Sequence, residues 1–525
     1  MVRGIRWGGL QLALLMAGLF AIAGVGAASE GNGGEAGEAA RALGEAASSG
    51  AAAEATPPAG SETDPAASGP LASESAAPSP LAAEPARGER EGEAKVEAGQ
   101  RPNHQADSLT IVLGGDLGLG GSDQPVDARG AYRHGTRHDW AALTAGVRPL
   151  IDGDVNFANL ETIVTDRNWP GNAGKAFRFR SHPEGVRHLV GLGFNVFSTA
   201  NNHVMDFGEA GARESIEHLQ RMGEHGLQAA PGLGLGYDAA SAPAEVTAKG
   251  VRLRVSAIGI GGNGLTASNG KTRPGMLAYH SPTAFQYTVK RLAEAPGDLR
   301  ILSVHYGREM SVRPASSDVR KLRDIAVREA GIDIVAGHHA HVVAGVQTLG
   351  GKVVFYGLGN LLHPGMQDMG RFERCRDYGL LARVHYRRSA NGKLTLAAIE
   401  AIPLVDMHLK ARAMPAERAK GRIGVLNHLA AGLDDKDAGA EGVRFVPQAD
   451  GSGLYCAPGA ETADGRAGRL CQGWAQDYAA LDKAVRGVSC GDRAPTSRRV
   501  VSGQGKPKSQ PGANSIANEI FRQPW

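Results

Sequence analysis

Cysteine is scarce in this chain, with four residues among 525. None lies near the start, which excludes attachment of a lipid to a cysteine there. Long apolar runs are missing too: residues 10–23 form an apolar run that is short for a membrane-spanning helix. Strong charge of one sign is also absent, since the net charge is +3. Nothing in that balance points to nucleic acid as a partner.

The short apolar run has the surroundings of an export signal. Arg3 and Arg6 precede it, and small residues follow it, with Val25-Gly26-Ala27 as a cleavage site. We predict a signal peptide at 1–28; the alternative is an uncleaved amino-terminal anchor. Both readings place the chain body outside the cytoplasm, in the periplasm or at the cell surface, tethered to the membrane in the second case.

Aromatic and β-branched residues are nearly absent from residues 29–107, which consist mainly of Ala, Glu, Gly, Pro and Ser. Such a composition cannot bury enough apolar surface to fold, so a disordered linker is expected. The end of the chain, residues 493–525, is basic at its start and rich in Ser, Gly and Pro, and a mostly disordered tail is expected there.

Between these segments, apolar strands alternate with helical patterns, which indicates an α/β domain over residues 108–405. Strands are expected at 109–113, 155–160, 195–199, 299–304 and 332–336, and helices at 139–150, 183–192, 211–224, 283–295 and 318–330. The pattern then becomes antiparallel, with strands at 342–348, 352–356, 379–386 and 394–402. A C-terminal extension, residues 406–492, completes the ordered part.

Polar side chains follow the predicted strands where each one ends: Asp116, Glu161, Asn202 with His203, His305, and His338 with His341. In an open α/β sheet, ligands bind at the carboxyl ends of strands. Imidazoles, carboxylates and an amide oxygen suit divalent zinc, manganese or iron, and are poor ligands for copper(I) or iron-sulfur clusters. The sequence therefore predicts a metal site assembled from several strand ends.

The order and spacing of these motifs resemble the poly-γ-glutamate capsule synthesis family, CapA, of the calcineurin-like metallophosphatase superfamily. The resemblance is carried by Gly115-Asp116, Asn159-Leu160-Glu161, Ala200-Asn201-Asn202-His203 with Asp206 and Gly208, His305-Tyr306-Gly307 with Glu309, Gly337-His338-His339-Ala340-His341-Val342 and Tyr356-Gly357-Leu358-Gly359-Asn360. It implies an αββα sandwich of two mixed β-sheets flanked by helices.

The resemblance also implies a role for each strand-end residue. One or two divalent ions (Mn, Fe or Zn) would be bound, the first by Asp116 and His341, the second by Asn202, His305 and His338, with Glu161 bridging them. His203 would stabilise charge on the reacting group, Asp206 would orient His203, and Glu309 would do the same or transfer a proton.

One position, Gly118, departs from the family pattern, and another, His339, lies between two of the proposed ligands. Metallophosphatases carry Asp-x-His in the first motif, and here Gly118 stands where the histidine is expected, which favours a single ion or a weakly held second one. His339 lies between two proposed ligands and is expected to point away from the metal.

Two further predictions concern residues outside the metal set. Arg180, in the segment KAFRFRSHPE, is expected at the rim of the site, where a guanidinium could bind a carboxylate or phosphate. In an oxidising compartment Cys456, Cys471 and Cys490 are disulfide candidates; a Cys456–Cys471 bond is preferred, because both residues lie in one loop-rich segment.

Three functions remain open at this point. The first is a metal-dependent hydrolase of the phosphoesterase type that acts on an anionic polymer or phosphoester in poly-γ-glutamate capsule synthesis. The second is a non-catalytic assembly factor that holds the polymer or a membrane-bound capsule synthase. The third is amide or epimerase-type chemistry on the same metal fold. His203 favours an enzyme, because the resemblance gives this residue a part in the reaction.

Limited proteolysis tests the predicted linker. Ordering a residue costs about 1–2 kcal/mol of backbone entropy, which the composition of residues 29–107 cannot offset. Protease should therefore release a core that begins near residue 107 and keeps its metal and its activity on a soluble substrate. If deletion of residues 29–107 unfolds the core or removes its metal, the linker prediction is wrong.

Overall fold

The computed structural model describes residues 108–491, except 122–123, 169–170, 172–174, 263–265, 268–272, 390–391 and 464. The predicted signal peptide, the linker at 29–107 and the tail at 493–525 lie outside the described residues. Within the described part of the chain, no helix combines the length and apolar character needed to cross a membrane.

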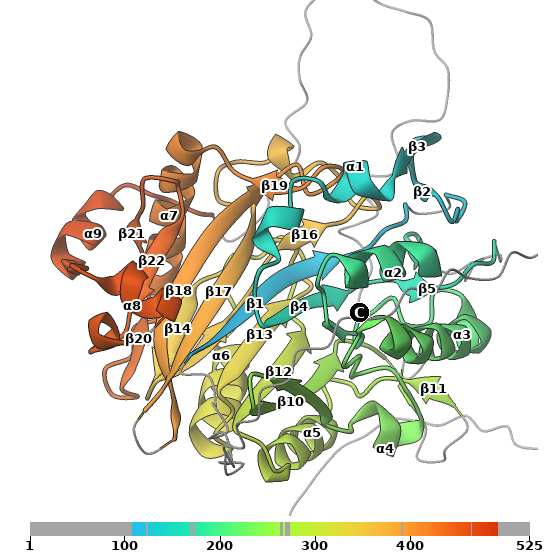
Figure 1. Cartoon of the computed structure of the whole chain (residues 1–525), viewed down its shortest axis with the longest axis horizontal. Helices are drawn as coiled ribbons and strands as arrows, with labels where there is room; N and C mark the ends of the chain where they lie inside the picture. Colours follow the sequence, from blue (N-terminus) through green and yellow to red (C-terminus); the bar gives the residue numbers. More distant parts are fainter. Residues whose placement is uncertain are drawn as a thin grey trace, which may run out of the picture. The chain divides into compact units, whose positions relative to one another are not determined.

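The first of two large β-sheets is built around β1 (Ser108–Leu117), which lies at its centre (Figure 1). On one side of β1 are the parallel strands β4 (Val155–Leu160) and β7 (Val196–Ser198). On the other side are the antiparallel strands β17 (Gly379–Arg388) and β18 (Leu394–Val405). The short strand β16 (Asn360–Leu362) pairs in parallel with the end of β1.

The second sheet has a parallel centre. Its order is β20 (Ala440–Gly442), β14 (Val346–Leu349), β15 (Lys352–Phe355), β13 (Ile334–His338), β12 (Leu299–His305), β10 (Val251–Gly259) and β9 (Ala244–Ala248). Strands β10, β12, β13 and β15 run in parallel, whereas β9, β14 and β20 pair antiparallel with their neighbours.

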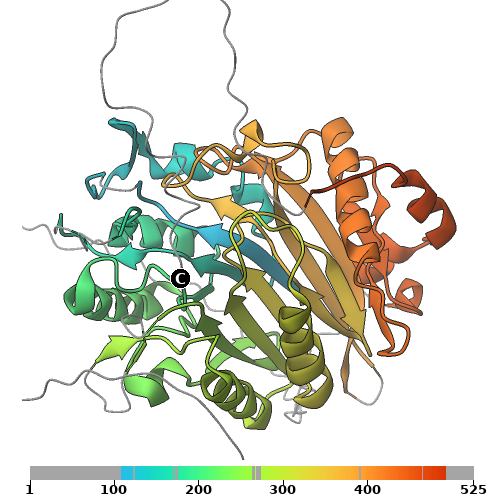
Figure 2. The same ribbon diagram turned by 180° about the vertical axis from the view of Figure 1, so that it is seen from behind.

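Alternating side chains give the second sheet two buried faces. Ile301 and Ile334 contribute to the same core cluster as residues of the first sheet, such as Phe157. Leu302 and Val335, one residue further on, pack instead with α5 (Pro282–Glu294) and the π-helical segment η3 (Arg320–Glu329). Figure 2 shows these helices on the outer face of the second sheet. The predicted sandwich of two mixed sheets flanked by helices is confirmed.

Most predicted elements are present with small shifts in their ends. The helix predicted at 139–150 is divided into α1 (Trp140–Thr144) and a 3₁₀ turn, η1 (Arg148–Leu150). The helices α2 (Pro183–Gly191), α3 (Gly208–Arg221) and α6 (Ser316–Val319) with η3 follow near the predicted positions. Strand β14 begins four residues later than predicted, at Val346, and β16 was not predicted.

The C-terminal extension adds strands to both sheets. Strand β22 (Gly453–Cys456) pairs with β18, and β21 (Val446–Pro447) and β19 (Arg412–Ala413) extend the same sheet. Strand β20 pairs with β14 at the edge of the second sheet. Helix α7 (Ala416–Ala431) contributes the buried residues Ile423, Leu426 and Leu429. The extension is therefore packed into the core of the domain.

Disulfides hold this extension in place. The predicted Cys456–Cys471 bond is present and joins β22 to α8 (Gly465–Cys471). Cys490, offered as a candidate, pairs with Cys375, which was not among the predicted partners. The second bond closes a separation of 115 residues and fixes the end of the extension beside the loop that follows β16.

Truncation at residue 405 tests whether the extension is needed for folding. Removal of residues 406–491 would expose the edges of β18 and β14 and the core beneath α7, where each buried Ile or Leu contributes about 1.5–3 kcal/mol. We expect the truncated chain to be insoluble or to melt well below a chain that ends at 491, as measured by circular dichroism. A soluble 108–405 fragment with an unchanged melting temperature would contradict this expectation.

Candidate metal centre

The candidate site lies where the parallel strands of the two sheets end. Asp116 is near the end of β1, Glu161 follows β4, and Asn202 and His203 lie in the turn after β7. From the second sheet, His305 ends β12 and His338 ends β13. Strand register explains the grouping: Asp116 is opposite Asn159, and His305 is opposite His338. The same alternation that points Ile301 and Ile334 between the sheets points both histidines there.

Glu161 is the centre of the group. It is fully buried, and neither carboxylate oxygen has a hydrogen-bond partner within the described chain. Its Oε1 lies 3.5 Å from His305 Nε2 and 3.6 Å from His203 Nε2, whereas Oε2 lies 3.8 Å from His341 Nδ1. A buried carboxylate without donors costs free energy unless a cation lies beside it.

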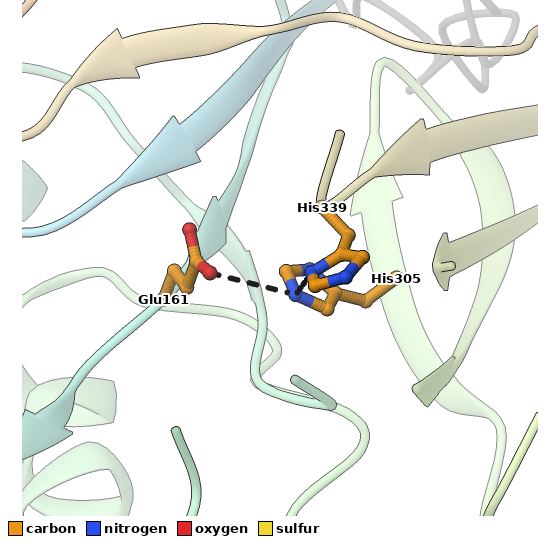
Figure 3. Close-up of side chains that lie close together, drawn as sticks. All are labelled: Glu161, His305 and His339. Carbon is orange, nitrogen blue, oxygen red and sulfur yellow. Dashed lines mark hydrogen bonds and ion pairs between the residues drawn. The ribbon is translucent and has the colours of Figure 1, made fainter. Parts of the chain in front are cut away.

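Two sets of possible metal ligands share Glu161. In one set, the ligand atoms of Glu161, His305 and His339 all lie within 4.8 Å of one another (Figure 3). In the other, Asp116, Glu161 and His341 satisfy the same limit. This sharing agrees with the bridging position expected for Glu161. Asn202 adds an oxygen to the first set, since its Oδ1 is 2.8 Å from His305 Nε2.

His339 points into the site, so the expectation that it points away is wrong. Its Nδ1 lies 3.1 Å from His305 Nε2, and its main-chain N–H donates to Asp116 Oδ2 at 3.2 Å. The cause is the backbone: φ is +87° at His339 and +56° at His341, a left-handed conformation rare for residues other than glycine. The simple alternation of a strand ends at His338, and the next side chain turns back toward the site.

His338 and Asp116 lie close together in the same group of residues. His338 Nδ1 is 3.6 Å from Asp116 Oδ1, and neither of its ring nitrogens has a hydrogen-bond partner within the described chain. Asp116 Oδ2 is 3.2 Å from His341 Nδ1, and Oδ1 accepts from Asn159 Nδ2 at 2.8 Å. The role of His338 as a ligand stays a prediction, because the two sets above include His339 and not His338.

Burial and mutual charge set the pKa values in the site. Burial raises the pKa of Glu161 well above its usual value, with His341 opposing and Asp116 adding to the shift. Burial would raise the pKa of Asp116 too, but the hydrogen bond and charge of His341 hold it below its usual range. Burial would lower the pKa of His341, but the two carboxylates raise it to about 10.

The other imidazoles are in the neutral form that binds metal ions. Burial lowers the pKa of His305 well below its usual value, of His338 to about 4 and of His339 to about 3. Buried, neutral imidazoles beside unpaired carboxylate oxygens are a donor set that fits divalent zinc, manganese or iron.

His203 is held by a second layer of contacts. Its Nδ1 lies 2.6 Å from Asp206 Oδ2, which is the orientation predicted for this pair. Lys175 was missed from the sequence; its Nζ lies 2.5 Å from Asp206 Oδ1 and donates to Asn202 O at 2.6 Å. Phe179 packs against the imidazole, with 4.3 Å between ring centroids. Burial lowers the pKa of His203 to about 4, although Asp206 opposes the shift.

The remaining predicted site residues are Glu309 and Arg180. Glu309 is partly buried, and its charge acts on both Glu161 and His341. Arg180, on β6 (Arg180–Ser181), is mostly buried, donates to Gln124 O at 2.9 Å and lies over the Phe207 ring at 5.1 Å. Its role in substrate binding stays a prediction.

A further buried histidine, His363, was also missed. It is fully buried, and its Nε2 lies 3.9 Å from Glu161 Oε2. Burial and the charges of His341 and His203 lower its pKa to about 3. The signal in the sequence is weak: His363 directly follows β16, as His305 ends β12, but β16 has only three residues. It was overlooked because β16 itself was not predicted.

The family of bacterial capsule synthesis proteins, PGA_cap, matches residues 110–364. This range covers the strands that carry Asp116, Glu161, His305 and His338, and ends one residue after His363.

Individual proteins are similar over a comparable range. A PGA biosynthesis protein, CapA, of Bacillus subtilis (strain 168) is 28% identical over 314 residues, which cover 58% of this chain and 75% of that protein. A Mycobacterium tuberculosis (strain CDC 1551 / Oshkosh) protein named "probable polyglutamine synthesis accessory protein" is 28% identical over 333 residues, 57% of this chain and 85% of its own length. The crystal structure of a hypothetical protein from Thermus thermophilus has a TM-score of 0.32 at 14% identity over 56% of this chain and 98% of that one, a likeness too low to carry an argument.

Metal analysis tests the ligand sets. We expect the purified protein to contain one to two equivalents of manganese, iron or zinc by elemental analysis, because two sets of ligands share Glu161. His339→Ala should weaken binding by at least the 10–100-fold typical of losing even an indirect partner of a metal.

Two further variants sharpen this test. His280→Ala, at an exposed position, should leave the metal content unchanged. His338→Ala separates the two assignments: a loss larger than that of His339→Ala supports the ligand set predicted from sequence, and a smaller loss supports the structural grouping. A wild-type protein that holds no metal after reconstitution would overturn the site.

Proposed function

Because this chain belongs to the family of bacterial capsule synthesis proteins, we propose that it is an exported metal-dependent hydrolase that acts on an anionic polymer or phosphoester in capsule synthesis. The observation that carries the proposal is the shared, buried Glu161, whose two oxygens face different histidines without any donor in the described chain. Structural carboxylates are normally hydrogen-bonded, whereas this one lies between two sets of possible ligands.

Asp116, Glu161 and His341 would hold one divalent ion, and Glu161, Asn202, His305 and His339 or His338 the other. When bound, such ions activate water and polarise the oxygen under attack, which is the chemistry of phosphoester hydrolysis. The chain itself supplies the closed surroundings. Asp116, Glu161 and the histidines are almost fully buried, which shields their polar atoms from bulk water.

His203 is the residue placed to act on the reacting group. Asp206 occupies Nδ1, so Nε2 is the nitrogen that faces the site, 3.6 Å from Glu161 Oε1. Lys175 and the main-chain N–H of Phe179, which donates to Asp206 Oδ2 at 2.7 Å, hold the aspartate in turn. A ring fixed at Nδ1 in this way can present Nε2 to developing charge without reorganisation.

The substrate class is inferred from relatives and from charge. A relative from Bacillus subtilis is named for PGA biosynthesis, and we propose poly-γ-glutamate or a related carboxylate polymer as the context for this chain. Lys175 beside the site and Arg180 on β6 would favour an anionic substrate. A polymer outside the membrane also requires the export that the first 28 residues predict, to the periplasm or cell surface.

A second candidate function is a non-catalytic accessory factor that binds the polymer or a membrane-bound capsule synthase. The name of the Mycobacterium tuberculosis relative, an accessory protein in polyglutamine synthesis, favours this alternative. Such a factor would need the fold and the metal but would gain nothing from His203, Asp206 and Lys175 as an arranged group. Amide or epimerase-type chemistry would use the same group on a different bond.

Replacement of His203 separates these functions. For an enzyme, His203→Ala should keep its metal and its fold but lose about 100-fold or more in turnover, the usual scale for the loss of one preorganised group. Turnover would be measured in a screen of phosphoester and γ-glutamyl substrates, with metal content measured on the same samples.

Exposed His225 offers a matched control, and His225→Ala should behave as the wild type in both measurements. Loss of metal in step with activity in His203→Ala would contradict the proposed role of His203. Wild-type protein that binds metal and polymer but turns over no substrate in the screen would favour the accessory function. Cleavage confined to γ-glutamyl substrates would favour amide chemistry over phosphoester hydrolysis.

A further inference from the structure

His363 is a buried histidine to which none of the roles above is assigned. Its main-chain N–H donates to Met407 O at 2.7 Å, and its carbonyl accepts from Met366 N at 2.9 Å. The ring packs edge-on against Phe179, with centroids 4.5 Å apart. Backbone and ring are thus both held in place, and the ring is directed toward Glu161.

The ring of His363 fills the space in front of Gly118. Strand β16 pairs in parallel with β1, with Leu362 beside Leu117, and Gly118 N–H donates to Leu362 O at 2.9 Å. A Cβ on Gly118 would lie 2.8 Å from His363 Nε2 and 2.9 Å from Cε1. The imidazole therefore occupies the volume that a side chain at position 118 would enter, two residues after Asp116.

The nitrogens of this ring are without partners. Neither has a hydrogen-bond partner of normal geometry in the part of the chain that the structure describes, although the Glu161 main chain lies close enough to the ring to oppose the lowering of its pKa. Nε2 faces Glu161 Oε2, the oxygen that also faces His341. Glu161 Oε1 faces His305 and His203 instead. His363 thus lies on the side of the site that holds Asp116 and His341.

We propose that His363 is a further ligand of the metal ion held by Asp116, Glu161 and His341, and that it replaces the histidine that the first motif lacks at Gly118. The proposal rests on the metal site of the proposed function and adds one imidazole to it. A buried polar group without a partner is unfavourable, and a metal bond to Nε2 would remove that cost for one nitrogen. His363 would then supply the protein ligand that this ion lacks because position 118 is glycine.

His363→Phe is the direct test. Phenylalanine keeps a ring against Phe179 and removes two unpaired nitrogens, so the metal-free variant should be as stable as the metal-free wild type, or more stable. Its affinity for one of two ions should fall by at least 10–100-fold, and its metal content should drop from about two equivalents toward one. Chelator competition with Zn²⁺ or Mn²⁺, elemental analysis and thermal unfolding without metal measure these effects.

A relocated histidine provides the second test. Gly118→His alone should be destabilised, because its side chain would collide with His363. Combined with His363→Gly, which clears that space, Gly118→His should regain the metal content that His363→Gly alone loses. His363→Gln, which keeps a polar side chain, covers the case in which His363→Phe does not fold, and should also lose affinity.

The outcomes separate this inference from the proposed function. If His363→Phe and His363→Gln keep the wild-type affinity and metal content, His363 only packs, and the inference is overturned while the metal site stands. If the double variant folds but regains no metal, His363 does not substitute for the residue missing at position 118. If the wild type binds no metal, the proposed function fails together with the inference.

Discussion

The burial of Glu161 without a donor is the constraint on which the site depends. A carboxylate in the interior is stable only when cations or hydrogen-bond donors surround it. In this protein the surroundings are imidazoles, and Glu161 and Asp116 raise the pKa of one of them, His341, to about 10; a metal ion bound to His341 would take the place of that proton. The sheets that bring these groups together must therefore be rigid, because a shift of a strand end would leave charge buried without compensation.

The register of the paired strands keeps the strand ends of the site in place. The parallel halves of the two sheets face one another, and Ser303 on β12 donates to Ser198 on β7 at 2.8 Å across the interface. Pairing then fixes Asp116 beside Asn159 and His305 beside His338. Close contacts exclude side chains at particular points: a Cβ on Gly115 would lie 1.9 Å from Gly359 O, so β1 and the loop before β16 can approach only with glycine there.

Sequence reasoning found the parts of this arrangement that depend on local periodicity. Strands with clear apolar runs placed Asp116, Glu161, His305 and His338 correctly at strand ends. It failed where position depends on distant pairing or unusual backbone. Strands β20 and β22 have only three or four residues, and their partners lie far away in the chain, so no local pattern revealed that the extension completes both sheets.

The misplacement of His339 and the omission of His363 have the same origin. Alternation predicts side-chain direction only inside a strand, and His339 comes one residue after β13, at a positive φ. His363 follows a strand of three residues, which is too short to show a pattern. Lys175 reaches Asp206 from an irregular segment for which no periodic signal exists.

Strain and burial at the site link metal binding to folding. Left-handed backbone at His339 and His341 costs about 1–3 kcal/mol per residue, and the unpaired atoms of Glu161, His338 and His363 add further cost. These costs lie in the strand ends, while the disulfides and the strands added by the extension lie elsewhere in the same domain. A cation bound at Glu161 would stabilise the folded chain by mass action, since the unfolded chain has no such site. The strand pairing and the disulfide bonds of the extension do not depend on a cation, so they contribute to the stability of the fold without one.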